Sequence, residues 1–154
     1  MNKVLGMVLI TAFIGGFVLI FIGCNLINPA CEDFLAKLGN KPEELEFAGC
    51  KKYKKFSLEA LEARYKVTGK DAPKVERFLQ QKFQMSELRF LCCGWEPVRR
   101  IENTNSPGYG SFRDSRGYEY EVSMFSQETL IDERQDWQNI PFLYVDVTLY
   151  LEQP

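Results

Sequence analysis

An uncharged apolar run near the start of the chain limits what the rest can fold into. Residues 4–22 contain 19 residues without a charge, and Lys3 is the only positive residue before them. A run of this length is typical of an export signal or a membrane-spanning helix rather than of a globular core. The 131 residues that follow Gly23 are enough for one compact domain.

The run ends in Gly23-Cys24, which resembles the lipobox of bacterial lipoproteins. The signal peptidase requires a small side chain before the cysteine, and the cysteine thiol takes the lipid, usually completed by acyl groups such as palmitate. We therefore expect residues 1–23 to be a lipoprotein signal peptide and Cys24 to be the lipidation site. Residues 24–154 would then form a single domain facing the periplasm.

An uncleaved membrane helix is the alternative for the same segment, because 19 apolar residues are nearly enough to span a bilayer. In either case the domain would belong to the cell envelope. By the sorting rule of enteric bacteria, an Asp after the lipidated cysteine holds a lipoprotein at the inner membrane. Asn25 in that position therefore favours the outer membrane.

Composition excludes several classes of function. The chain has no histidine, which removes Ser-His and Cys-His catalysis and histidine-ligated metal sites. The net charge of -2 argues against nucleic-acid binding, which normally requires a basic surface. No residues form a recognisable catalytic constellation or cofactor motif. The sequence therefore favours a protein that is not an enzyme and has no cofactor or metal.

Four cysteines besides Cys24 lie in the exported part: Cys31, Cys50, Cys92 and Cys93. An even number in an oxidising compartment predicts disulfides. Successive residues of a strand point to opposite faces, so Cys92 and Cys93 are expected to bond elsewhere. Cys31 lies on the apolar stripe of the first helix, which favours Cys31–Cys92 and leaves Cys50–Cys93. A redox pair or a four-thiolate zinc site stays open, although Cys-x-x-Cys spacing is absent.

Hydrophobic periodicity predicts two helices. Residues 28–39 carry apolar side chains at helical spacing after Asn28-Pro29, and Gly39 is typical of the residue that follows a helix. Residues 72–83 repeat the helical spacing, with Asp71 as the cap and Pro73 in the first turn.

Alternation of apolar and polar residues predicts strands in residues 45–50, 56–67, 88–95, 118–125 and 140–151. The alternation slips by one residue near Ala60-Leu61, which indicates a bulge or a short break in the strand. Residues 97–117 are turn-rich and indicate an exposed hairpin or loop, and residues 126–139 one helical turn at most. This order predicts an α+β fold: an antiparallel sheet of about five or six strands with two helices packed on one face, stapled by disulfides.

The turn-rich segment is the best candidate for a partner-binding surface. Aromatic and arginine side chains on an exposed loop are typical of interface anchors. The candidate residues are Arg99, Arg100, Tyr109, Phe112 and Arg113. A variable surface loop without a partner is the simpler explanation of the same composition.

Two other charged clusters have ordinary structural explanations. Lysines surround Tyr53 in residues 51–55, where they could attract anionic lipid or an acidic partner, or simply protect a sheet edge from aggregation. Glu119 and Glu121 share one face of a strand, where a solvated surface is a simpler explanation than acid–base catalysis.

Cys92-Cys93-Gly94-Trp95-Glu96, with Cys31-Glu32-Asp33-Phe34-Leu35 before it and a tyrosine-rich strand after it, resembles a family of small bacterial lipoproteins of unknown function. The resemblance covers most of residues 24–154 and implies no catalytic residues. Small lipoproteins of this architecture resemble immunity proteins that neutralise toxins delivered to the periplasm.

Three hypotheses follow. The first is a membrane-anchored, non-enzymatic protein-binding module, specifically an immunity protein that occludes a secreted antibacterial effector. The second is an envelope lipoprotein of housekeeping type that assists assembly of a secretion or envelope complex. The third, an enzyme, would need two carboxylates that meet in one cleft, because histidine is absent.

Overall fold

The computed structural model describes residues 29–39, 41–55, 58–98 and 108–151. The predicted signal peptide and the predicted lipidation site Cys24 lie outside these residues, as do Arg99 and Arg100. The elements in chain order are α1 (Phe34–Lys37), β1 (Glu46–Lys55), β2 (Leu58–Val67), α2 (Ala72–Phe83), β3 (Leu88–Leu91), β4 (Gly94–Pro97), β5 (Gly110–Arg113), β6 (Glu119–Ser126), the 3-10 helix η1 (Arg134–Asn139) and β7 (Leu143–Tyr150).

The predicted α+β fold is confirmed. Five antiparallel strands form the main sheet in the order β1-β2-β7-β6-β5, and β3 and β4 form a separate two-stranded hairpin. The last strand of the chain, β7, is therefore the central strand, between β2 and β6. Its side chains are buried from Val145 through Leu149, as expected for a strand covered on both sides.

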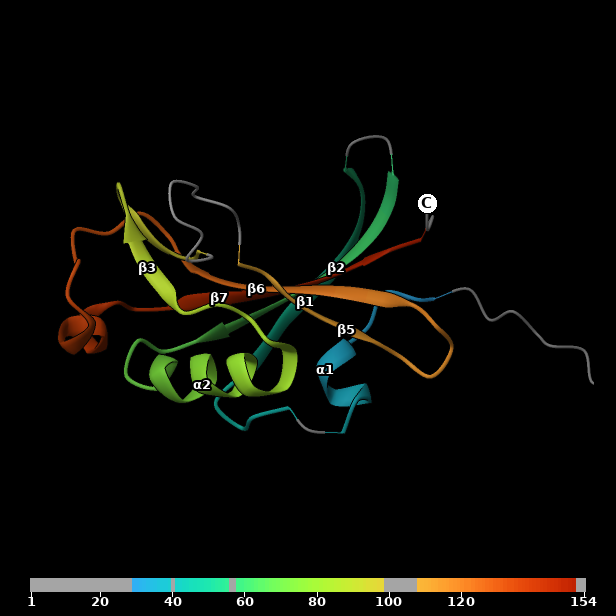
Figure 1. Ribbon diagram of the computed structural model, residues 1–154, viewed down its shortest axis with the longest axis horizontal. Coiled ribbons are helices and arrows are strands. Elements are labelled where there is room, and N and C mark those ends of the chain that lie inside the picture. Colours follow the sequence, from blue (N-terminus) through green and yellow to red (C-terminus); the bar gives the residue numbers. More distant parts are fainter. Residues whose placement is uncertain (1–28, 40, 56–57, 99–107, 152–154) are drawn as a thin grey trace, which may run out of the picture.

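Both α-helices lie on one face of the sheet, as the sequence predicts (Figure 1). Alternate residues of β2, β6 and β7 point to this face and form the core with the apolar side of α2. Val75, Leu79 and Phe83 supply that side of α2, each at most 3% exposed. On the opposite side of the sheet, Figure 1 shows the β3–β4 hairpin at one end and the outer part of β1 and β2 at the other.

Helix α1 is shorter than the sequence predicts, because Asp33 rather than Asn28 caps it. The Asp33 carboxylate accepts a hydrogen bond from Ala36 N–H at 3.0 Å. It also accepts one from the Tyr65 hydroxyl at 2.9 Å, and the same hydroxyl accepts Leu35 N–H at 3.0 Å. The start of α1 is thus attached to β2. Gly39 follows the helix with φ 77°, as predicted.

Two predictions of strand geometry are wrong. The bulge lies in β1, between Phe47 and Gly49, and β2 is continuous through Ala60-Leu61. The alternation appeared to slip because Ala60, on the opposite face from Leu61, is also buried. The predicted strand 88–95 is a hairpin that turns at Cys92-Cys93. Phe90 pairs with Trp95 across this turn, so apolar alternation continues through it.

The predicted disulfide pairing is also wrong. The structure joins Cys31 to Cys50, with their Cα atoms 5.5 Å apart, and leaves Cys92 and Cys93 as exposed thiols. Cys31 lies in the exposed segment before α1 rather than on the helix. Cys50 points from β1 to the helix side of the sheet, beside that segment. Cys92 and Cys93 lie in the hairpin turn and not on the two faces of a core strand.

Candidate functional site: the open face of the sheet

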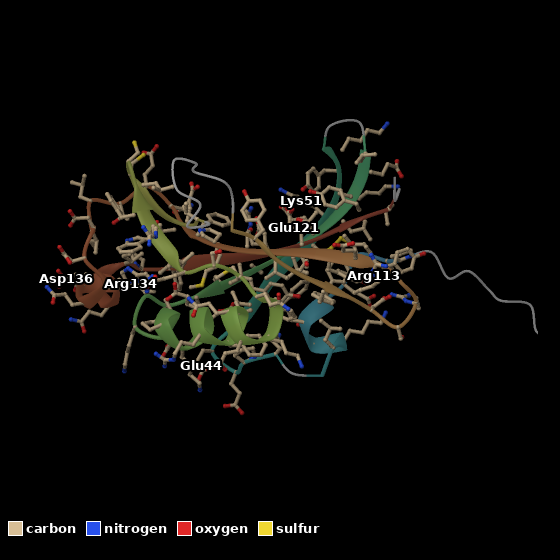
Figure 2. All side chains as sticks on the ribbon, viewed as in Figure 1. Glu44, Lys51, Arg113, Glu121, Arg134 and Asp136 are labelled. Carbon is tan, nitrogen blue, oxygen red and sulfur yellow. A yellow bond between two sulfur atoms is a disulfide. The ribbon has the colours of Figure 1, made fainter. Side chains whose placement is uncertain are left out.

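The face of the main sheet opposite the helices carries a continuous set of polar and aromatic side chains, which we call the open face. Strand pairing places these residues in transverse rows. One row runs across the sheet in the order Lys51, Glu62, Thr148, Glu121, and the other in the order Arg64, Asp146, Ser123. Figure 2 shows Lys51 and Glu121 on this side and Glu44 on the helix side. The rows join residues from four strands into one surface.

The open face is hollowed by a cavity of about 240 Å³, which we call the trough. Its floor is the sheet, and residues of β4 and of the segment before β5 form a wall. The lining residues are Glu62, Glu96, Pro97, Tyr109, Glu121, Ser123, Phe125, Asp146 and Thr148. A second hollow of about 250 Å³ adjoins it through Glu62 and extends to β1. Asp146 and Thr148 are only 8% and 4% exposed, although no helix covers them.

Arg64, which lines the second hollow, forms a two-pronged ion pair with Asp146 of the trough. The guanidinium donates from Nε and Nη2 to the two carboxylate oxygens, both at 2.7 Å. It also lies 5.5 Å from the ring centre of Phe125 and 5.9 Å from that of Tyr144. The Asp146 hydrogen bond raises the pKa of Arg64 above its ordinary value. Arg64 therefore occupies both oxygens of the Asp146 carboxylate.

Glu62 is paired less completely. Its Oε1 lies 3.0 Å from the Lys51 ammonium and 3.6 Å from the Arg64 guanidinium, yet it accepts no hydrogen bond of good geometry. Glu62 therefore lines the trough as a largely buried carboxylate held between two cations, and not by a two-pronged hydrogen bond.

The structure separates the residues predicted to bind a partner. Tyr109 lines the trough and is 39% exposed. Phe112 lies on β5 and points to the helix side, stacked on Tyr120 at 4.5 Å between ring centres and 5.1 Å from Phe83. It belongs to the core rather than to an exposed loop. Arg113 is exposed at the end of β5, where it pairs with Glu119 at 3.0 Å.

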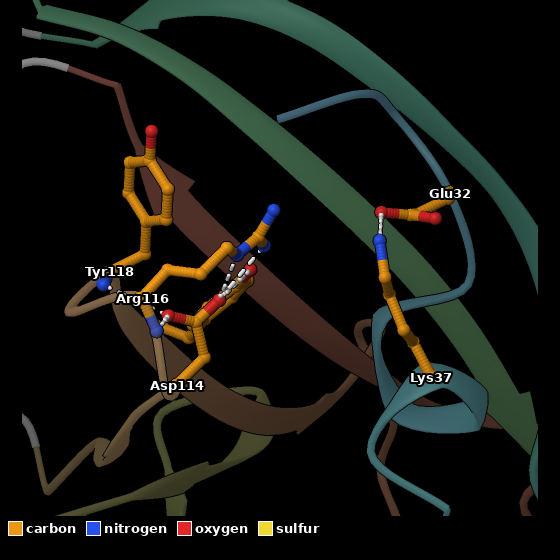
Figure 3. Close-up of polar contacts among 6 residues, drawn as sticks. Glu32, Lys37, Asp114, Arg116 and Tyr118 are labelled. Carbon is orange, nitrogen blue, oxygen red and sulfur yellow. Dashed lines mark hydrogen bonds and ion pairs between the residues drawn. The ribbon is translucent and has the colours of Figure 1, made fainter. Parts of the chain in front are cut away.

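The end of the segment predicted as an exposed loop is an ordered turn (Figure 3). The Asp114 carboxylate accepts hydrogen bonds from the backbone N–H groups of Arg116 and Tyr118 and from the Arg116 guanidinium. Burial opposes ionisation, but these hydrogen bonds prevail and hold the pKa of Asp114 below its ordinary value. Asp114 thus fixes the turn between β5 and β6 and takes part in no site.

Sequence reasoning missed Glu62, Arg64, Phe125 and Asp146. Each occupies a polar or partly exposed position of an alternating strand, which is the usual place of a solvated side chain. Arg64 and Asp146 meet only because β7 pairs with β2 in one particular register. No local pattern in the sequence carries that information, although Asp146, the single charged residue of β7, is a signal that could have been followed.

Another cavity, of about 510 Å³, lies beside α2 and is lined in part by Glu76, Glu87 and Arg134. Arg134 donates from both terminal nitrogens to the buried Glu76 carboxylate and stacks 4.7 Å from the Trp137 ring centre. Glu76 also accepts Leu88 N–H at 2.7 Å. These contacts join η1, α2 and β3, so we interpret this cluster as structural.

The comparisons with known proteins place the chain beside an uncharacterised family. Residues 20–95 match the model of a family described as a domain of unknown function, DUF4952. No curated protein matches the chain, and no solved structure does. The match includes Cys92-Cys93 but ends at Trp95, so β5, β6, η1 and β7 lie beyond it.

Two further findings concern the part of the chain that the structure describes. It contains no helix long and apolar enough to cross a bilayer. Among the same residues, no group of three or more Cys, Asp or Glu side chains has an arrangement that could hold a metal ion.

Proposed function

We propose that this chain is a lipid-anchored, protein-binding lipoprotein of the cell envelope whose trough receives a segment of a partner protein. The observation that carries the proposal is a hollow that combines aromatic side chains with an acidic lining. Tyr109 and Phe125 supply apolar contact area, and four carboxylates line the same hollow. Anchoring through Cys24 would hold the trough in the periplasm, and we favour the outer membrane over the inner membrane as its location.

The chemistry of the lining indicates what the partner presents. Four carboxylates line the trough, those of Glu62, Glu96, Glu121 and Asp146, and its described lining contains no lysine or arginine. Lys51 and Arg64 pair with Glu62 and Asp146 from beside the trough. Arginine or lysine side chains of a partner would complement this surface. A toxin whose cationic active-site rim enters the trough would be occluded, which is the immunity function that we favour within this class.

An enzymatic function could use the same carboxylates, because four of them line a single cavity. Arg64 occupies both oxygens of Asp146, so the acid or base would have to be Glu62, Glu96 or Glu121. Binding is the better-supported function. The paired Asp146 and the aromatic lining can both contact a partner, and neither contact requires a proton transfer.

The deciding experiment is co-purification of the full-length protein extracted from membranes, followed by mass spectrometry of its companions. A stoichiometric lipase, amidase or nuclease supports immunity. Components of a secretion or envelope complex support the assembly function instead and exclude the toxin hypothesis. If the protein is recovered without a stoichiometric companion under both growth and competition conditions, the binding proposal is contradicted.

The same assay locates the binding surface. Combined Tyr109→Ala and Phe125→Ala substitution should abolish recovery of the partner, since both side chains line the trough. Gln81→Ala, an exposed change on α2 on the opposite side of the sheet, is the matched control. Phe112 is left unchanged because its replacement would disturb the core. Equal recovery with the double variant and with the control would show that the partner binds elsewhere.

A further inference from the structure

Cys92 and Cys93 occupy the tip of the β3–β4 hairpin, where Leu91 pairs with Gly94. Both side chains are exposed. The Cys93 N–H donates to the Leu91 carbonyl, which closes a three-residue turn centred on Cys92. Cys92 has φ 55°, in the left-handed region. This turn places the two sulfur atoms 3.0 Å apart, although adjacent residues of an extended strand would point to opposite faces.

Folding alone gives no reason for cysteine at these positions. A residue other than glycine in a left-handed conformation is strained, and glycine or asparagine would be the usual choice. Both Sγ atoms are exposed and neither belongs to the Cys31–Cys50 disulfide. Two exposed cysteines in such a turn are therefore better explained by a reaction of their thiols than by a requirement of folding.

The rest of the hairpin holds the two thiols in one geometry. Trp95 is 4% exposed, and its indole N–H donates to the Ile131 carbonyl at 2.8 Å. Trp95 N–H donates to the Ser126 hydroxyl at 2.9 Å, and Thr129 N–H donates to the Cys93 carbonyl at 2.8 Å. The turn is thus fixed on the segment that follows β6, while its sulfur atoms face solvent.

We propose that Cys92 and Cys93 form a redox-active dithiol that closes into a disulfide between adjacent residues. The oxidant is an external disulfide, either a small molecule such as oxidised glutathione or a disulfide of another protein. Closing the ring requires the sulfur atoms to approach from 3.0 Å to a bond length of about 2.05 Å. The turn has therefore already completed most of the approach.

The reaction balances as two successive exchanges. One cysteine thiolate attacks the external disulfide, forms a mixed disulfide and releases the first external thiolate. The second cysteine then attacks the mixed disulfide, forms the ring and releases the second external thiolate, while both cysteine protons pass to the released thiolates. Two cysteines are oxidised, and one external disulfide is reduced to two thiols.

The groups around the two thiols determine how the exchange rate depends on pH. The Cys93 thiol donates to the Cys92 sulfur, and Glu128 and Glu96 add negative charge nearby, which together raise the pKa of Cys93. The attacking species is the thiolate, so the exchange rate should increase with pH above neutrality. The environment differs from that of Cys-x-x-Cys oxidoreductases, whose attacking thiol has a lowered pKa.

This inference does not depend on the trough or on the lipid anchor, and its test is separate from theirs. Full-length protein extracted in detergent is equilibrated in glutathione buffers of increasing oxidation and quenched with acid. Free thiols are then labelled with a maleimide, and the peptide carrying both cysteines is examined by mass spectrometry. We expect it to lose both labels together and to become lighter by two hydrogen atoms, with no glutathione attached.

Cys92→Ser and Cys93→Ser are the matched variants, because each keeps the turn and removes one sulfur. In either variant the remaining cysteine cannot close the ring, so we expect it to retain its label or to carry one glutathione. The proposal is overturned if the unaltered peptide keeps both labels in oxidising buffer. It is equally overturned if that peptide accumulates glutathione on each cysteine or joins a second copy of the chain.

Discussion

At the scale of single residues, Gly69 shows where the backbone leaves no space for a side chain. Its N–H donates to the Ile140 carbonyl at 3.2 Å, and a Cβ at this position would overlap the carbonyl oxygens of Trp137 and Ile140. Backbone groups cannot move as a flexible side chain does. Gly69 therefore allows the turn between β2 and α2 to pack on the end of η1.

We predict that Gly69→Ala destabilises the protein by about 3 kcal/mol, because overpacking against the backbone forces the turn and η1 apart. Urea denaturation of residues 24–154 measures the change. Lys70→Ala, at the exposed neighbouring position, should alter stability by no more than about 0.5 kcal/mol. Equal midpoints for the two variants would contradict the packing of this turn on η1.

Asp33 gives a prediction for acid pH. Burial would raise the pKa of its carboxyl, but hydrogen bonds from Lys41, Ala36 N–H and the Tyr65 hydroxyl prevail and lower it. A carboxyl with a lower pKa in the folded state contributes stability that is fully present above its unfolded-state pKa. That contribution is lost as the pH falls through the folded-state pKa. We expect the loss to begin as the pH falls towards the ordinary pKa of 3.8 and to continue below it.

Asp33→Asn isolates this contribution. The amide oxygen can still cap α1, but the charge is gone, so the variant should be less stable at pH 7 and should lose less stability on acidification. Thermal midpoints measured from pH 7 down to pH 2 give both slopes. Parallel curves for the two proteins would show that Asp33 titrates alike in the folded and unfolded states.

At the scale of elements, helix α2 and strand β7 could be predicted from the sequence, because the pattern of each is local. Helical spacing and Pro73 in the first turn place α2, and apolar residues on both faces place β7. The β3–β4 hairpin could not be predicted, since its alternation continues through a turn that contains neither glycine nor asparagine. The bulge in β1 was missed because burial of Ala60 imitated one in β2.

The candidate site was predictable only in part, because sequence patterns indicate local features and not which strands pair. Tyr109 was found because aromatic residues in a turn-rich segment are typical of interfaces. Arg64 and Asp146 were not, because their meeting depends on the pairing of β2 with β7 across 82 positions of the chain. Periodicity assigns a residue to a face of a strand, but only register assigns it a neighbour.

The Cys31–Cys50 disulfide joins the segment before α1 to β1 and closes a loop of 19 residues. A loop of this length predicts a loss of about 3 kcal/mol when both cysteines are replaced by serine, mainly through the unfolded state. Urea denaturation without reductant measures the loss. The matched control is Cys92→Ser with Cys93→Ser, which removes two exposed thiols and should change stability by no more than about 0.5 kcal/mol in reducing buffer. A similar loss in both double variants would contradict the assigned pairing.

At the scale of the whole molecule, the sheet order makes the two halves of the chain interdependent. Strand β2, from the first half, has β1 on one side and β7 on the other. The match to the family of unknown function stops at Trp95, before β7 begins. The matched segment thus includes α2 and the residues of β2 that face it, but not the strand that completes the sheet beneath that helix.

We predict that residues 24–98 alone do not form a stable domain. Without β7, the backbone groups of β2 that pair with it lose their partners. Val75 and Leu79 of α2, each 0% exposed in the whole domain, also lose the buried side chains Val145 and Val147 from the core. Near-ultraviolet circular dichroism and urea denaturation should show no cooperative transition for residues 24–98 and a single one for residues 24–154. A cooperative transition in the shorter chain would mean that β1, β2 and α2 bury enough surface by themselves.

In that case β6 and β7 would be additions to a domain that folds without them. The trough would then be built largely from those added strands, because Asp146, Thr148, Glu121 and Phe125 all come from β6 and β7.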